Sequence, residues 1–173
     1  AIYLNEFKGA DFWHGAFEGE PDKEGLAEVL QAAVKNDPKK FTDELESFIG
    51  VNYFYLHRIF RGLKEAWSSG KTLDWDKIFS FSLKYLSRDK KVILEEAFQA
   101  QGEDSGKGKY IWIVEALVDL IEDGCRDDAK AFEAKYFESV EQIFGLILPL
   151  LKGEKHPDTQ RDALSYAMNT SLG

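Results

Sequence analysis

The stretch Tyr53-Phe54-Tyr55-Leu56-His57-Arg58-Ile59-Phe60-Arg61-Gly62-Leu63-Lys64-Glu65-Ala66-Trp67 has the clearest periodicity in the chain. Large apolar residues recur every three or four positions, which is typical of one face of an α-helix. Each large side chain on that face contributes about 1.5–3 kcal/mol when fully buried. Asn52 is suited to cap the start of the helix, and Gly70 to a left-handed residue after its end. We therefore expect a helix here with neighbours packed around it, and we expect its buried face to comprise Tyr53, Leu56, Phe60, Leu63 and Trp67, flanked by Tyr55, Ile59 and Ala66.

Composition predicts a folded, acidic protein. The chain has 173 residues, of which 44% are hydrophobic and 14% aromatic, enough for a substantial core. Its formal net charge of −9 argues against nonspecific binding to nucleic acid or anionic membranes. Cys125 is the only cysteine, so an intrachain disulfide is excluded, and we predict a cytoplasmic location. No apolar run reaches the roughly 18–20 residues that span a bilayer.

We expect residues 1–173 to form a single all-helical domain. The segment 1–20 is rich in aromatic residues and glycine, which predicts irregular structure there. The chain begins at Ala1 without an initiator Met and ends at Gly173 soon after a helical pattern, so we expect a segment of a longer protein.

The same periodicity predicts further helices on both sides of the central one. Asp37 and Asp74 are suited to cap two of them, and Gly124 to end another. Val29, Leu83 and Phe137 are among the residues that we expect to be buried. The predicted ranges are 21–36, 38–49, 75–86, 88–101, 110–123, 129–134, 137–151 and 159–169.

Short connections between helices favour antiparallel neighbours, so the fold class that we predict is all-α, with helical hairpins stacked as an α-solenoid. A weak internal repeat agrees with this. The ranges 53–86 and 110–151 each contain a helix that begins with an aromatic residue, then a glycine, then a second helix that begins with an aromatic residue.

The C-terminal part resembles a HEAT-type helical repeat. Leu148-Pro149-Leu150-Leu151-Lys152-Gly153 is followed by His156-Pro157-Asp158-Thr159-Gln160-Arg161-Asp162-Ala163, in which Pro157, Arg161, Ala163 and Ala167 match the pattern. The arginine comes one residue late, and Thr159 replaces the usual valine. The resemblance covers one repeat of roughly 40 residues. It implies a HEAT- or armadillo-like α-solenoid, whose concave surface binds proteins or nucleic acids, and it implies no catalytic residue.

We expect the last helix, 159–169, to turn Leu164, Ala167 and Met168 toward the helix 137–151. The latter carries more apolar surface than one neighbour covers. We therefore expect an exposed apolar strip at this end of a repeat stack.

Several motifs invite a chemical reading that their spacing does not support. Gly102-Glu103-Asp104-Ser105-Gly106-Lys107 has three residues between its glycines where a phosphate loop has four, which favours a plain surface loop. His14, His57 and His156 lack the spacing of metal ligands, and we expect His57 to be a surface residue.

Two groups of charged residues have alternative interpretations. Glu115, Asp119 and Glu122 share the polar side of one helix, either as a solvated acidic face or as ligands for a hard metal ion. The side chains of Arg58, Arg61, Lys64 and Trp67 are candidates for binding a partner. The alternative for Arg61 is an ordinary surface pair with Glu65, four residues later.

The sequence predicts no catalytic, cofactor-binding or metal-ligating residue. We interpret the chain as a non-enzymatic helical-repeat scaffold or protein-interaction segment of a larger intracellular protein. The expected partner is a protein, or flanking domains of the same chain, rather than a membrane, a nucleic acid or a small-molecule substrate. The alternatives are an all-helical enzyme or small-molecule-binding domain that uses carboxylates such as Glu115 and Asp119, and a nucleic-acid-binding solenoid.

Overall fold

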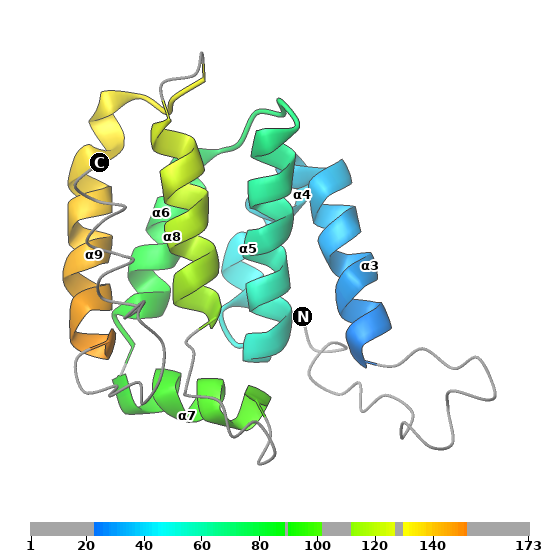
Figure 1. The fold of residues 1–173 in the computed structure, drawn as a ribbon, viewed down its shortest axis with the longest axis vertical. Coiled ribbons are helices and arrows are strands. Elements are labelled where there is room, and N and C mark those ends of the chain that lie inside the picture. Colours follow the sequence, from blue (N-terminus) through cyan, green and yellow to red (C-terminus); the bar gives the residue numbers. More distant parts are fainter. Residues whose placement is uncertain (1–22, 89, 102–111, 127–129, 152–173) are drawn as a thin grey trace, which may run out of the picture.

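A computed structural model describes residues 23–88, 90–101, 112–126 and 130–151. Every regular element in these ranges is helical, which confirms the all-α class (Figure 1). Within the same ranges, no helix combines the length and apolarity needed to cross a membrane. The elements are α3 (Lys23–Asn36), α4 (Pro38–Asp43), the 3-10 helix η1 (Leu45–Phe48), α5 (Tyr53–Ser68), α6 (Trp75–Leu86), α7 (Lys90–Gln101), α8 (Trp112–Cys125), the 3-10 helix η2 (Ala134–Tyr136) and α9 (Phe137–Leu151).

The described helices form two layers. Helices α3, α5 and α8 lie side by side in that order, and α6 and α9 pack together behind them, with α4 and η1 beside α6 (Figure 1). Helix α7 lies across one end of the first layer, in contact with α5. Helices α5 and α8 run in the same direction, because Tyr53 reaches Ile113 near their starts and Trp67 reaches Asp123 near their ends.

Helix α5 is the centre of the first layer. Its predicted stripe is buried along the whole length, with Leu56, Ile59 and Leu63 fully inaccessible. The flanking Tyr55 and Ala66 are buried too, because α3 covers one edge of the helix and α8 the other. This confirms the wide apolar face that the spacing predicts.

Local signals explain where the helices begin and end. The Asn52 side chain accepts a hydrogen bond from the Phe54 backbone N–H (3.0 Å), and Asp74 accepts one from Lys77 (3.2 Å). Asp37 caps α4 in the same way. Gly70 has a φ of 87°, a left-handed conformation that glycine adopts without steric cost. These four predictions are confirmed.

The predicted inward positions of Val29 and Phe137 are wrong. Val29 is 66% exposed and Phe137 is 56% exposed. Helix α3 instead turns Ala27 and Val34 toward α5, which puts Val29 on the opposite side of the helix. Helix α9 packs on α6 through Ile143, Ile147 and Leu150, so Phe137 lies on its flank.

Other differences concern helix ends. Gly124 does not end α8 but lies inside it, where a Cβ would be 2.6 Å from the rings of Phe132 and Trp75. The segment predicted as one helix over 38–49 divides at Glu44 into α4 and η1. The short helix predicted over 129–134 is instead the 3-10 turn η2 at 134–136. Leu83 is only partly buried.

Several predictions fall outside the described residues. They are the irregular segment 1–20, the loop at 102–108, the helix 159–169 and most of the HEAT-like stretch.

Candidate interaction surface

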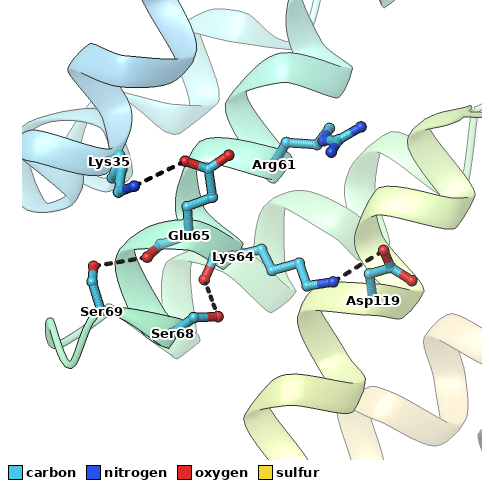
Figure 2. Close-up of a pocket in the computed structure, with 7 residues that line it drawn as sticks. All are labelled: Lys35, Arg61, Lys64, Glu65, Ser68, Ser69 and Asp119. Carbon is cyan, nitrogen blue, oxygen red and sulfur yellow. Dashed lines mark hydrogen bonds and ion pairs between the residues drawn. The ribbon is translucent and has the colours of Figure 1, made fainter.

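A charged hollow of about 400 Å³ opens on the outer side of the first layer. It lies where α3, α5 and α8 meet, and Figure 2 shows its lining side chains. Helix α5 supplies most of them because its polar side faces away from the buried stripe. The lining residues are Lys35, Arg61, Lys64, Glu65, Ser68, Ser69 and Asp119.

Ion pairs tie α5 to both neighbours across this surface. The ammonium of Lys35 on α3 lies 3.3 Å from the Glu65 carboxylate, and that of Lys64 lies 3.2 Å from Asp119 on α8 (Figure 2). Gln31 on α3 adds two bonds, because its amide donates to Glu65 and accepts from the Arg58 guanidinium at 3.2 Å. Most of the charge in the hollow is therefore engaged within the protein.

The structure brings together three of the four predicted partner-binding residues. Arg58, Arg61 and Lys64 lie on the polar side of α5, but Arg58 bonds Gln31 and Lys64 pairs with Asp119. Arg61 is exposed. Trp67 is only 8% exposed, and its indole N–H donates to the Asp123 backbone carbonyl at 3.0 Å.

Trp67 instead lines a second hollow of about 380 Å³ between the ends of α5 and α8. The ammonium of Lys130 lies 4.0 Å from the ring centroid of Trp67, which is a cation–π contact. Lys130 also donates to the Lys71 carbonyl, and desolvation lowers the pKa of its ammonium. The Ser68 hydroxyl bonds the Asp123 carboxylate at 3.0 Å. These contacts connect the two helix ends and use most of the polar groups in the second hollow.

The acidic side of α8 faces the basic side of α5. Desolvation raises the pKa of Glu115, the charge of Asp119 raises it further, and Arg61 and Lys64 oppose the shift. Asp119 is paired with Lys64, so this side is not simply a solvated acidic face. Among the residues that the structure describes, no group of three or more His, Cys, Asp or Glu side chains is placed to hold a metal ion.

His57 is more enclosed than the surface position predicted for it. Its side chain is partly buried, and this burial lowers the pKa of the imidazole to about 4, with further lowering by Arg58 and Arg61. The residue is therefore neutral at physiological pH, since imidazole usually titrates near 6.5.

Sequence reasoning missed the groups that other segments of the chain bring to α5. Gln31, Lys35, Asp123 and Lys130 all contact it, yet nothing in the local sequence around them predicts this. The predicted pair between Arg61 and Glu65 gives way to Lys35, which approaches Glu65 from α3.

The chain matches no protein-family model, no curated protein and no solved structure.

Proposed function

We propose that this chain is a helical-repeat scaffold segment that binds a protein partner, with its hairpins stacked as a HEAT- or armadillo-like α-solenoid. Helices α5 and α6 form one hairpin, and α8 and α9 form the next. Helix α5 packs beside α8, and α6 beside α9, so corresponding helices of the two hairpins meet (Figure 1). In repeat proteins, each repeat packs against its neighbour through corresponding elements.

The observation that carries the proposal is that the contacts between the two hairpins join residues 55 to 60 positions apart in both layers. The Tyr53 hydroxyl accepts a hydrogen bond from the backbone N–H of Ile113, which lies 60 residues further along the chain. Lys64 donates to Asp119, which lies 55 residues further along. In the second layer, the Tyr136 hydroxyl bonds Asp76 at a separation of 60 residues. Similar separations in both layers support the interpretation of the two hairpins as repeated units.

The first hairpin, formed by α3 with α4 and η1, has a similar relation to the second. Gln31 bonds Glu65 at a separation of 34 residues and Arg58 at 27, and Lys77 bonds Asp43 at 34. Lys84 bonds Glu46 at 38, so these separations overlap the periods of helical repeats, which run from about 33 to 47 residues. The larger separation to the third hairpin is consistent with α7, which intervenes in the chain.

Binding of a protein partner is supported by the place of the charged hollow. Repeat proteins present extended surfaces built from successive repeats. Helices α3, α5 and α8 belong to three successive hairpins, and each contributes a charged side chain to the hollow: Lys35, Arg61 and Asp119.

Site-specific photo-cross-linking tests the proposal. A benzophenone amino acid at Ser69, an exposed residue of the hollow, is expected to capture a discrete partner in an extract of the cells that make the protein. Excess unmodified chain should compete with the capture. The matched control is Ser80, which is exposed on α6 in the other layer. Equal capture at both positions, or none at Ser69, would contradict a partner on this surface.

The rival enzyme function is tested by titrating the protein with Mg²⁺, Mn²⁺ and Zn²⁺ in a calorimeter. The scaffold proposal predicts no saturable heat. A saturable signal that Asp119→Asn abolishes would instead favour the carboxylate enzyme.

A further inference from the structure

Among the described residues that line the hollow, Arg61 is a charged group whose guanidinium is not engaged in an ion pair. Its neighbours Glu65 and Lys64 are paired with Lys35 and Asp119, whereas Arg61 makes no hydrogen bond or ion pair with residues 23–88, 90–101, 112–126 or 130–151. In Figure 2 its guanidinium extends away from Glu65, on the side of α5 that faces α8.

The guanidinium of Arg61 is suited to bind a planar anion such as a carboxylate. A guanidinium presents five N–H donors in a fixed fork, which matches the two oxygens of a carboxylate. Lys64 lies on the same side of Glu65 as Arg61, and its ammonium retains donors beyond the one used in its ion pair with Asp119 (Figure 2).

We propose that the hollow receives a single Asp or Glu carboxylate of a partner protein, bound bidentately by Arg61 on the side of α5 that faces α8. This inference rests on the proposed function, since it names the group of the partner that the α3–α5–α8 surface recognises. Arg61 is the binding residue, and the Lys64–Asp119 ion pair connects α5 to α8 beside it.

The remaining charges favour an isolated carboxylate over a polyanion. The hollow holds the carboxylates of Glu65 and Asp119 among its three cations, so its own charge is close to balance. Glu115 lies near enough for the charge of Arg61 to lower its pKa, and it adds negative charge beside the hollow. A nucleic-acid backbone carries one negative charge about every 1.7 Å in a duplex, so it would meet these carboxylates as well as Arg61.

The experiment measures binding of unlabelled peptides by calorimetry at low and at physiological salt, with acetylated N-termini and amidated C-termini so that Glu supplies the only carboxylate. The probes are peptides of alanine and glycine that contain no Glu, one Glu or two adjacent Glu residues. We expect saturable binding of the Glu peptides alone, weakened by salt because the site is exposed. Arg61→Gln should weaken binding about tenfold, the loss expected for one hydrogen-bonded charged group.

Arg61→Lys retains the charge but not the fork, so it should recover only part of the affinity. The matched control is Lys91→Gln, which removes a cation whose side chain is 81% exposed on α7. Thermal melting of each variant checks that it is folded.

Unchanged peptide binding by Arg61→Gln would overturn the inference, as would the absence of binding by any Glu peptide at millimolar concentration. Tighter binding of a single-stranded oligonucleotide, lost in Arg61→Gln, would overturn it in favour of nucleic acid. This test can fail without the proposed function failing. If the photo-cross-linker at Ser69 still captures a partner protein in the Arg61→Gln variant, the protein partner is retained and the carboxylate site at Arg61 is rejected.

Discussion

Helix α5 contributes to two regions on its opposite sides. One is an aromatic cluster between the layers, formed by Trp67, Trp75, Phe79 and Phe132, and the other is the charged hollow on the first layer. In the cluster, the Trp75 ring lies 5.0 Å from Trp67 and 4.9 Å from Phe132, measured between ring centroids. In the hollow, the paired side chains of Lys35 and Glu65 are 44% and 38% exposed. Buried apolar area stabilises a fold in proportion to its extent, whereas an exposed ion pair contributes about 0–1 kcal/mol. The cluster therefore holds the layers together, and the ion pairs of the hollow contribute little to that stability.

The largest expected effect is that of Trp75→Ala in the cluster. Trp75 is 5% exposed and also stacks on Phe79 at 5.3 Å, so its removal leaves a cavity between the layers. We expect the free energy of unfolding to fall by about 3–5 kcal/mol in a urea titration. The control Val29→Ala, at a residue that is 66% exposed, should change it by less than about 0.5 kcal/mol. A loss for Trp75→Ala as small as that of the control would remove the contrast between cluster and hollow.

The second prediction compares three glycines within helices. At Gly62 a Cβ would lie 2.7 Å from the Gln31 carbonyl oxygen and from the Val34 Cβ, so α3 itself would have to move. We expect Gly62→Ala to destabilise the protein by about 1–3 kcal/mol. Gly124→Ala should cost less, because ring atoms of Phe132 and Trp75 are its closest neighbours and side chains can turn.

Gly145→Ala is the control for this series, since no described residue beyond its chain neighbours and the adjacent backbone of α9 comes within 4 Å of its Cβ position. We expect it to stabilise α9 by about 0.5–1 kcal/mol through helix propensity alone. Urea titration of the three variants gives the order directly. A stabilising Gly62→Ala would show that α3 and α5 are not in close contact, and would weaken the stacking on which the hollow depends.

These positions also show what the sequence could and could not predict. Caps such as Asn52 and Asp74 were predictable because a cap and the N–H that it satisfies are two or three residues apart. The range of α5 and its buried stripe follow from periodicity for the same reason. The local sequence around Gly124 predicts a helix end, because nothing near it in the chain indicates the close approach of Trp75 and Phe132.

The site was predictable only in part. Periodicity placed Arg58, Arg61 and Lys64 on one side of α5, but which of them stays available depends on groups from other helices. Lys35 comes from α3 and Asp119 from α8, and nothing near Arg61 in the chain indicates either approach. The exposure of Val29 and Phe137 has the same origin, because the neighbours decide which flank of a helix is covered.

The third prediction concerns pH and lies at the edge of the hollow. Because the pKa of His57 is about 4 in the folded protein, the unfolded chain binds a proton there between about pH 6.5 and pH 4 that the folded chain does not. The free energy of unfolding should therefore fall through this range as the pH is lowered. We expect a contribution of about 1–2 kcal/mol, less than the full shift implies, since the side chain is only partly buried.

Subtracting the profile of His57→Gln from that of the wild type isolates this term, because all other titrating groups are common to both proteins. Urea titrations between pH 4 and pH 7.5 supply both profiles. Parallel profiles would mean that His57 is solvated in the folded state, and that Arg58 and Arg61 exert no measurable field on this side of α5.

The smallest expected effect is that of Asp119→Asn, which breaks the ion pair with Lys64 at the rim of the hollow. The two side chains are 27% and 33% exposed, so solvent already screens their attraction. We expect a loss of about 0.2–1 kcal/mol at low ionic strength, falling toward zero as salt is added. Urea titrations at both ionic strengths measure this, with Glu133→Gln as a control, because the Glu133–Lys135 pair is 73% and 54% exposed and should contribute nothing measurable. A loss above about 2 kcal/mol that persists at high salt would make the pair a buried structural contact. The hollow would then resemble the aromatic cluster in energetic terms, and the division between a stabilising interior and an available surface would not hold on this side of α5.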